Sequence, residues 1–392
     1  MTESLIVGYA RTPFAKFLGQ FGSVPATQLG GHAGRSALSK SGVTPEQVQQ
    51  VLVGQVLTGG AGQNPARQTA VAAGVPMTTP SLAVNGVCLS GSEAVVAAHR
   101  LIQLGEADVV LVVGQESMTL APHAASIRAG AKFGDMTLVD TMQYDGLTDA
   151  FEEVAMGAST ESFNPRHALT REEQDAFAAA SFQRHEQAQS AGVFDDEIVP
   201  IEVGRGKRAT TVSADDGGRA GVTAEALSAL RPAFSPEGTI TAGNASQISD
   251  GAAALVIASD AFVQQHGLTP LAKVVANALV AGEDVSLHTQ PADAIEAALE
   301  RAGRSVDELK AVEINEAFAA VGIVSTKQLG VDPEIVNANG GAIAIGHPLG
   351  ASGARIIGHL ARRLSQLGAG SLGAVGICGG GGQGTGVLLE AV

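Results

Sequence analysis

The sequence predicts an α/β protein made of two similar halves with an insertion between them. Hydrophobic residues make up 45% of the 392 residues, charged residues only 16% and aromatic residues 4%, with 50 glycines and no tryptophan. Helices and strands in such a chain pack closely through small side chains, as in tightly layered α/β proteins. The chain is also too long for one simple core, which indicates two domains or one duplicated unit.

An internal repeat indicates the order of elements in each half. Residues 42–57 align without gaps on residues 303–318, and each copy is typical of a capped helical turn followed by a strand that ends in polar residues. Further on, Ser90–Gly91 has a counterpart in Ser352–Gly353, and the second copy carries a longer loop that holds His347. The repeat therefore predicts that both halves present loops at equivalent strand ends.

A segment richer in charge separates the two copies. It runs from Leu120 to Ala245 and holds a helix candidate at 174–191, opened by the capping-box sequence Thr170-Arg-Glu-Glu173. An insertion of this length is expected to form a lid or ligand-binding subdomain, with a dimerisation arm as the alternative. Residues 251–258 then form a buried strand that returns to the first half. The expected organisation is an N-terminal half at residues 1–120 completed by about 246–268, an inserted loop domain at 121–245, and a C-terminal half at 269–392.

Charge and hydropathy exclude several classes of partner. The chain has 24 Lys and Arg against 39 Asp and Glu, a net charge of −15, and no basic run longer than two residues, so no nucleic-acid partner is expected. It starts without a basic, apolar leader and contains no apolar stretch of about 18 residues, so we expect a cytoplasmic protein with no membrane partner. The nine histidines show no metal-binding spacing, and no metal site is expected.

The two cysteines are the first candidates for chemistry. Cys88 lies in the turn 85–91, ahead of a helix candidate from Ser92, so a helix N-terminus is expected to face its sulfur and favour the thiolate. Cys378 opens a glycine-rich turn just beyond a predicted strand. The alternative for either cysteine is that of a small buried hydrophobe. A disulfide between them stays open, although a reducing compartment argues against it.

Two further polar residues and a glycine tract complete the candidates. His347 precedes a proline in a turn and is a candidate base for a thiol nucleophile, or else an ordinary buried histidine. Asn315 ends a predicted strand, where it could hold an oxyanion or a water, or cap the following helix. The tract 379–382 offers free backbone N–H groups for an oxyanion or a phosphate, with a flexible hairpin as the alternative. Neither a dinucleotide fingerprint nor a P-loop is present there.

Seven motifs in order make the sequence similar to the thiolase family over essentially its whole length. They are Asn-x-x-Cys-x-Ser-Gly at 85–91, Gly-Gln-Glu-Ser-Met at 114–118, Asp-Gly-Leu-x-Asp at 145–149, Thr-Ala-Gly-Asn-Ala-Ser at 241–246, Asn-Glu-Ala-Phe at 315–318, Gly-His-Pro-x-Gly at 346–350 and Cys-Gly-Gly-Gly at 378–381. The resemblance implies two βαβαβαββ halves that form a five-layered α-β-α-β-α core with an inserted loop domain.

The resemblance also implies a role for each candidate. Cys88 is the expected acylated nucleophile, and His347 the base that takes its proton. His347, with a water held by Asn315, would stabilise the negative charge on the second substrate. Cys378 would remove a proton from the methyl carbon of that substrate. The backbone N–H groups of Cys88 and Gly380 would form a second oxyanion hole.

Coenzyme A is the expected substrate and product, with no tightly bound cofactor. By resemblance, Arg219 lies near its phosphates and Ser246 contacts the pantetheine chain. Family members are dimers or tetramers, and the segment 121–145 resembles a tetramer-forming loop, so a homotetramer is favoured over a dimer. The expected lining of the pantetheine and acyl tunnel is Leu147, Met156, Phe234 and Phe318.

The favoured reaction is the reversible condensation of two acetyl-CoA to acetoacetyl-CoA. Three alternatives remain at this stage: a degradative 3-ketoacyl-CoA thiolase of fatty-acid β-oxidation, a non-catalytic acyl-CoA or sterol-binding protein on the same scaffold, and a condensing enzyme with one cysteine and paired histidines. The second cysteine disfavours the last of these. One position departs from the family: acetoacetyl-CoA-forming members often carry His before the Met-Gly at 156–157, and this chain has Ala155. We expect the smaller residue to admit some longer or branched acyl chains.

Overall fold

Strands from both halves of the chain join in one mixed sheet. The computed structural model describes residues 2–130, 132–204, 206 and 209–392, and within them the sheet has ten strands in the order β12-β13-β14-β11-β1-β10-β5-β3-β4, with β2 beside β10. The two halves meet where Ser4–Ile6 pairs antiparallel with Ala272–Val274. The strands are β1 (Ser4–Arg11), β2 (Ala15–Lys16), β3 (Gln50–Gly54), β4 (Ser81–Val84), β5 (Val109–Ser117), β10 (Ser249–Ser259), β11 (Ala272–Ala281), β12 (Leu309–Ile314), β13 (Leu372–Gly379) and β14 (Gln383–Ala391).

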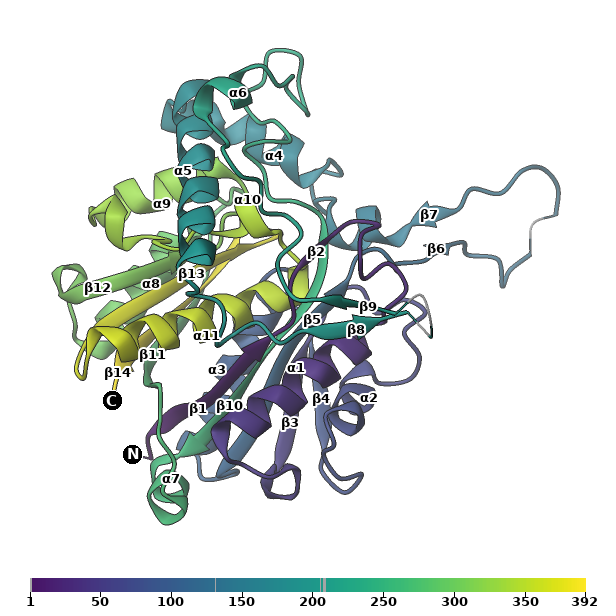
Figure 1. Ribbon diagram of the computed structural model, residues 1–392. Coiled ribbons are helices and arrows are strands. Elements are labelled where there is room, and N and C mark those ends of the chain that lie inside the picture. Colours follow the sequence, from purple (N-terminus) through teal and green to yellow (C-terminus); the bar gives the residue numbers. More distant parts are fainter. Residues whose placement is uncertain (1, 131, 205, 207–208) are drawn as a thin grey trace.

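Helices cover the sheet in layers (Figure 1). One apolar core lies between α1, α2 and the first-half strands, a second surrounds α3 and α11 and touches strands of both halves, and a third lies between α8 and the second-half strands. The order of layers is therefore helices, first-half strands, paired central helices, second-half strands and helices, and the two sets of strands are continuous through the pairing of β1 with β11. These helices are α1 (Ala26–Ser41), α2 (Pro65–Ala72), α3 (Ser90–Gln103), α8 (Gln290–Ala302) and α11 (Leu349–Leu367). A further helix, α9 (Ala319–Leu329), packs beside α8.

The repeat seen in the sequence is confirmed at the level of local structure. A short 3₁₀ turn with a full capping box, Thr44 with Gln47 and Ser305 with Glu308, precedes β3 in one half and β12 in the other. The predicted return strand is β10, which pairs with both β1 and β5. The third strand of the second half is reduced to a single bridge between Val312 and Val336.

The central helices α3 and α11 approach unusually closely at their N-terminal ends. A Cβ atom placed on Gly91 of α3 would lie 2.7 Å from the backbone nitrogen of Ala354, and one on Gly353 of α11 would lie 2.4 Å from that of Ser92. Any side chain at either position would force the helices apart. Because Cys88 precedes α3 and His347 precedes α11, this contact brings the loops with the two candidate catalytic residues together.

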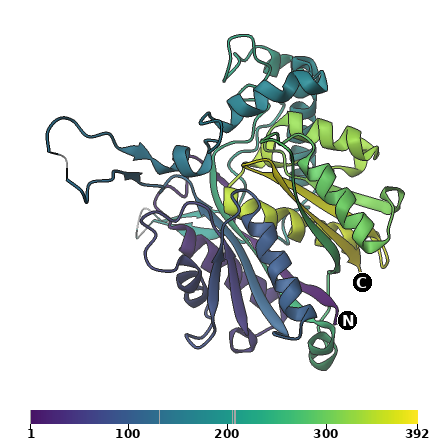
Figure 2. The same cartoon turned by 180° about the vertical axis from the view of Figure 1, so that it is seen from behind.

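The insertion packs against both halves and sends out one arm. Its long helix α5 (Arg171–Ser190) begins at the predicted capping box of Thr170 and Glu173. The segment that includes β6 and β7 projects from the body as a hairpin (Figures 1 and 2). Phe133, between these two strands, is fully exposed. The other elements of the insertion are β6 (His123–Ala124), β7 (Val139–Asp140), α4 (Met156–Phe163), β8 (Ile201–Val203), β9 (Thr210–Val212) and α6 (Ala224–Ser228), while α7 (Asp260–His266) and α10 (Ala342–Ile345) lie outside it.

A buried cation ties the insertion to the sheet. The Arg11 side chain is 0% exposed; its Nη1 and Nη2 donate to the Asp215 carboxylate at 2.6 and 2.8 Å, and its Nε donates to Glu197 Oε1 at 2.7 Å. Burial alone would raise the pKa of Glu197, but His359 and Arg11 beside it lower that pKa to about 2. Charges buried in this way are stabilising only while their partners remain.

Replacing Arg11 by methionine is therefore expected to lower the free energy of unfolding at pH 7 by about 3–5 kcal/mol, because two carboxylates lose their buried partner. Since the folded pKa of Glu197 lies below its usual value of 4.5, the stabilisation is complete above pH 4.5 and is lost as the pH falls toward about 2. Equilibrium urea unfolding of both proteins at pH 7 and pH 4 measures this difference. An equal difference at the two pH values would contradict the electrostatic explanation.

Candidate active site

Most of the predicted site residues line or adjoin one cavity of about 370 Å³ between the two halves and the insertion. Its lining is mostly apolar, with a few polar groups that converge on it, as in small-molecule binding sites. The sequence-predicted residues in the lining are Cys88, Leu147, Met156, Phe234, Ser246, Phe318, His347, Cys378 and Gly380, and Ala155 also belongs to it. Asn315 lies behind this lining and touches His347.

Cys88 sits in a constrained turn between β4 and α3. Val87, just before it, has a φ of +53°, which is rare for a β-branched residue and costs backbone energy. The backbone N–H groups of Cys88 and Gly380 donate to the sulfur, but burial outweighs them and raises the pKa of the Cys88 thiol to about 12. The side chain is partly exposed where it lines the cavity. Burial therefore favours the neutral thiol of Cys88 in the free protein and opposes the thiolate that the sequence predicts.

His347 is held in one orientation by its neighbours. Its Nδ1 lies 2.6 Å from Ser352 Oγ, and that hydroxyl donates to the backbone oxygen of Pro348 at 3.1 Å. The hydroxyl proton is thus used, so Nδ1 carries the imidazole hydrogen and Nε2 is left as an acceptor, 3.4 Å from the donating Nδ2 of Asn315. Burial, and the nearby charge of Arg355, lower the pKa of His347 to about 3. The histidine is therefore neutral with a free Nε2, as a base requires.

Asn315 follows the last residue of β12 and is completely buried. Its Nδ2 contacts His347, whereas its Oδ1 has no hydrogen-bond partner among the residues that the structure describes. The alternative role of Asn315, as the cap of the following helix, is not seen, because α9 begins at Ala319, four residues later. A buried amide oxygen without a partner is unfavourable unless a ligand or water meets it.

Cys378 and the glycine tract form the opposite wall. Cys378 is the last residue but one of β13 and pairs with Gly384 of β14, whereas the sequence places it just beyond the strand. Burial, and the proximity of Cys88, raise the pKa of the Cys378 thiol. The tract is a closely packed turn, since a Cβ atom on Gly382 would lie 2.0 Å from the backbone oxygen of Asp284. Gly380 belongs to this turn, and its backbone N–H donates to the Cys88 sulfur.

The residues expected along the coenzyme A tunnel divide into two groups. Leu147, Met156, Phe234, Ser246 and Phe318 all line the cavity. A side chain on Gly157 would collide with the Phe234 ring, which a Cβ atom would approach to 2.1 Å, so this glycine allows the ring to reach the cavity. By contrast, Arg219 is exposed and lies outside the lining.

Sequence reasoning missed the residue that orients His347. Ser352 appeared only as the counterpart of Ser90 in the repeat, and that match is the one signal that could have singled it out. Ser90 makes a similar local contact, since its hydroxyl donates to the backbone oxygen of Val87 at 2.6 Å. The equivalent serines therefore fix the turns that carry Cys88 and His347.

The protonation states predict how Cys88 reacts in the free protein. Because the pKa of its thiol is raised to about 12, the alkylation rate with iodoacetamide should rise about tenfold per pH unit between pH 7 and pH 9. Peptide mass spectrometry after short exposure separates alkylation at Cys88 from that at Cys378. A rate that is constant over this range would indicate a preformed thiolate and contradict the neutral thiol at Cys88.

Within the described ranges, no three acidic, histidine or cysteine side chains come together as metal ligands. The same part of the chain has no helix of the length and apolarity that crossing a bilayer requires.

A partly exposed thiol shares its cavity with a neutral histidine and a second thiol, and two backbone N–H groups donate to its sulfur. This arrangement defines a site for acyl transfer through cysteine. The chain belongs to the thiolase family: the thiolase N-terminal domain matches residues 4–261 and the thiolase C-terminal domain matches residues 268–391. These two domain matches confirm the family resemblance that the sequence motifs indicate.

Its relatives are similar over their full lengths. The chain is 51% identical over 393 residues to a probable acetyl-CoA acetyltransferase of Mycobacterium tuberculosis and 46% identical over 390 residues to an acetyl-CoA acetyltransferase of Paracoccus denitrificans, covering 100% of each. The Bacillus anthracis acetyl-CoA acetyltransferase has a similar structure, with a TM-score of 0.96, 35% identity and coverage of 100% of this chain and 99% of that one. The Acat5 thiolase of Ascaris suum in complex with coenzyme A gives a TM-score of 0.93 at 37% identity, with 100% of both chains covered.

Proposed function

We propose that this protein is an acyltransferase that catalyses the reversible condensation of two acetyl-CoA to acetoacetyl-CoA and free CoA. The observation that carries the proposal is the shared cavity, in which Cys88 and Cys378 lie with a histidine whose Nε2 is free to accept a proton. The relatives named acetyl-CoA acetyltransferase support the same reaction over a degradative 3-ketoacyl-CoA thiolase.

The first half-reaction transfers an acetyl group to Cys88. The sulfur attacks the thioester carbon of acetyl-CoA while His347 Nε2 takes the thiol proton, so neither group needs to be ionised beforehand. The oxyanion that forms accepts hydrogen bonds from the N–H groups of Cys88 and Gly380, and each such donor typically contributes ~3 kcal/mol of transition-state stabilisation. The bond to the CoA sulfur breaks, and the CoA thiolate recovers the proton from His347.

The second half-reaction forms the carbon–carbon bond. Cys378 gives its thiol proton to His347 Nε2, and the resulting thiolate removes a proton from the methyl group of a second acetyl-CoA. The thioester oxygen of that substrate takes up the negative charge as an enolate. That oxygen is stabilised by the protonated Nε2 of His347 and by a water bound to Asn315, whose Oδ1 has no partner in the described part of the protein. The carbanion attacks the acetyl group on Cys88, and the Cys88 thiolate leaves to give acetoacetyl-CoA. His347 returns its proton to Cys88, and Cys378 keeps the methyl proton, so both thiols and the neutral histidine are restored.

The insertion supplies much of the coenzyme A site. Met156 and Phe234 of the insertion line the cavity from one side, with Ser246 beside them, so we propose that residues 121–245 cover the bound pantetheine chain. Arg219 lies on the same insertion and, exposed to solvent, remains our candidate for the phosphates of coenzyme A, which need a local cation in a chain of net charge −15.

We further propose a cytoplasmic homotetramer. The projecting arm carries several exposed apolar side chains, which is unfavourable in water unless another subunit covers them. These side chains are Ile127, Phe133, Met136, Leu138 and Val139. Deleting the tip of the arm should then reduce the molar mass in solution.

The activity is tested by acetoacetyl-CoA cleavage with free CoA, in parallel with straight-chain 3-ketoacyl-CoA substrates of eight and twelve carbons. We expect the highest kcat/KM for acetoacetyl-CoA. A higher value for the longer substrates would assign the protein to the degradative class, and no cleavage of any of them would refute the proposal.

Ala155 is expected to widen the choice of acyl chain. Its methyl side chain lines the cavity next to Met156, where a histidine would occupy more of the space. The Ala155→His variant should therefore discriminate more strongly against five-carbon and branched 3-ketoacyl-CoA, by about tenfold in the ratio of kcat/KM values. Unchanged or weaker discrimination would show that Ala155 does not set the acyl range.

A further inference from the structure

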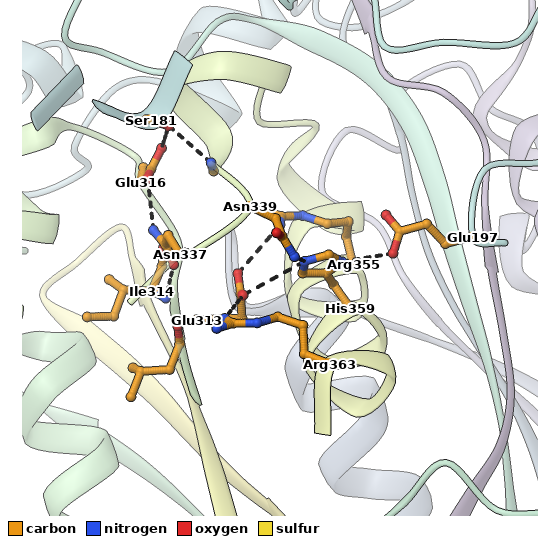
Figure 3. A network of polar contacts seen from close by, with 12 residues as sticks. Ser181, Glu197, Glu313, Ile314, Glu316, Asn337, Asn339, Arg355, His359 and Arg363 are labelled. Carbon is orange, nitrogen blue, oxygen red and sulfur yellow. Dashed lines mark hydrogen bonds and ion pairs between the residues drawn. The ribbon is translucent and has the colours of Figure 1, made fainter. Parts of the chain in front are cut away.

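Asn337 makes an unusual set of hydrogen bonds on either side of Asn315. Its Oδ1 accepts from the backbone N–H of Ile314 at 2.8 Å, and its Nδ2 donates to the backbone oxygen of the same residue at 2.8 Å and to Glu316 Oε1 at 2.8 Å (Figure 3). One amide thus holds the residue before Asn315 and the residue after it. Asn337 is 2% exposed and does not line the cavity.

Glu316 extends this clamp to the segment that leads to His347. Its Oε2 accepts from Ser181 Oγ at 2.6 Å and from the backbone N–H of Ile343 at 3.1 Å, and Ser181 Oγ accepts from the N–H of Gly341 at 3.0 Å. The fit is tight, since a Cβ atom on Gly341 would lie 2.3 Å from the Glu316 carboxyl carbon. Ile343 belongs to α10, which ends at Ile345, two residues before His347.

The clamp therefore joins the strand end that carries Asn315 to the turn that carries His347. Without it, Asn315 would depend on its own few contacts, of which the one to His347 is 3.4 Å long. The backbone of Asn337 also has a φ of +45°, a region that asparagine, aspartate and glycine tolerate better than other residues. The position thus requires both an amide and a left-handed backbone.

We propose that Asn337 is a positioning residue that, through Ile314 and Glu316, fixes the Asn315 amide relative to His347 for the carbon–carbon step. This inference rests on the proposed function, because it assigns Asn315 to the enolate and leaves acyl transfer to Cys88 and His347. Asn337 touches neither substrate nor thiol. Its loss should slow carbon–carbon bond formation and cleavage much more than acyl transfer.

Two assays on the same purified enzyme separate these steps. Exchange of labelled CoA into acetyl-CoA requires only acylation and deacylation of Cys88, whereas acetoacetyl-CoA cleavage also requires the enolate. For Asn337→Gly, which keeps the left-handed backbone, we expect cleavage to fall about 100-fold while exchange stays within about threefold of wild type.

The chain offers a matched control. Asn64 also has a φ of +45° and caps α2 by accepting from the N–H of Arg67, but it is exposed and lies outside the cavity lining. Asn64→Gly makes the same substitution in the same backbone conformation. It should leave the ratio of cleavage to exchange unchanged.

A second pair of variants tests the contact with Glu316 directly. Asn337→Asp sets one carboxylate against another at the 2.8 Å contact and should lower cleavage at least as much as the glycine variant. Adding Glu316→Gln to this variant lets the glutamine amide donate to the aspartate carboxylate at that contact. The double variant should cleave acetoacetyl-CoA about tenfold faster than Asn337→Asp alone. This comparison decides the matter even if Asn337→Gly does not fold.

The outcomes are distinct. Equal losses of cleavage and exchange, or no recovery in the double variant, would overturn the positioning role and leave Asn337 a residue of general stability. Unchanged cleavage in Asn337→Gly would also overturn it. A wild-type protein that exchanges CoA but does not cleave acetoacetyl-CoA would instead refute the proposed function, and with it the basis of this inference.

Discussion

Acetoacetyl-CoA cleavage by a Cys88→Ala variant is expected to fall by at least about 10⁴-fold, because the covalent path is lost with the nucleophile. Labelled-CoA exchange should fall with it, since both reactions pass through the acyl group on this sulfur. The alanine side chain fits the partly exposed position without a clash, so the fold should persist. The measurement is the initial rate of both reactions, beside circular dichroism of the two proteins.

A matched variant sharpens the result. Cys88→Ser keeps a side chain of similar shape and a hydrogen-bond acceptor for the N–H groups of Cys88 and Gly380, but it replaces the thiol by a much weaker acid. It should be nearly as inactive as the alanine variant. Substantial cleavage by either protein while folded would show that another group carries the acyl intermediate.

Cys378→Ala is expected to separate the two half-reactions. Cys88, His347 and the Gly380 N–H stay in place, so exchange of labelled CoA into acetyl-CoA should continue and mass spectrometry should find one acetyl group on Cys88. Cleavage of acetoacetyl-CoA should fall by about 10³-fold, within the range that a general acid–base group contributes. The expected pattern resembles that of Asn337→Gly, but with a larger loss because Cys378 handles the proton itself.

Cys378 also has a simpler structural role that the experiment must distinguish. It is buried in β13, where an alanine leaves only a small gap. Normal cleavage by Cys378→Ala would remove it from the chemistry. Loss of exchange and cleavage together would mean that the variant disturbs the Cys88 pocket rather than proton transfer.

Much of the fold could be predicted because its signals are local. The capping boxes at Thr44, Thr170 and Ser305 each lie within four residues and form as their side chains dictate. The buried strand predicted at 251–258 is an uninterrupted apolar run, and β10 contains it. The end of the strand before Cys378 was placed too early, because glycine favours turns unless pairing with a neighbour such as Gly384 extends the strand.

The structure brings most of the candidate site residues around one cavity, but it leaves Arg219 outside, and the protonation of the site does not follow from the sequence. The residue types of Cys88, His347, Cys378 and Asn315 are visible in the sequence, whereas the neutral thiol at Cys88 is not. The helix that follows Cys88 is its neighbour in the sequence, whereas the burial that raises the pKa of its thiol involves residues of both halves, which line the cavity together.

By itself, the sequence determined the α/β class, the duplicated order of elements and the side chains able to do chemistry, because each of these depends on neighbours along the chain. Only the tertiary structure decided that Gly91 and Gly353 bring two helix starts into contact, that Ser352 orients His347, and that Asn337 clamps the strand end at Asn315. These relations depend on packing distances of a few ångströms between remote segments, and no local preference encodes such distances.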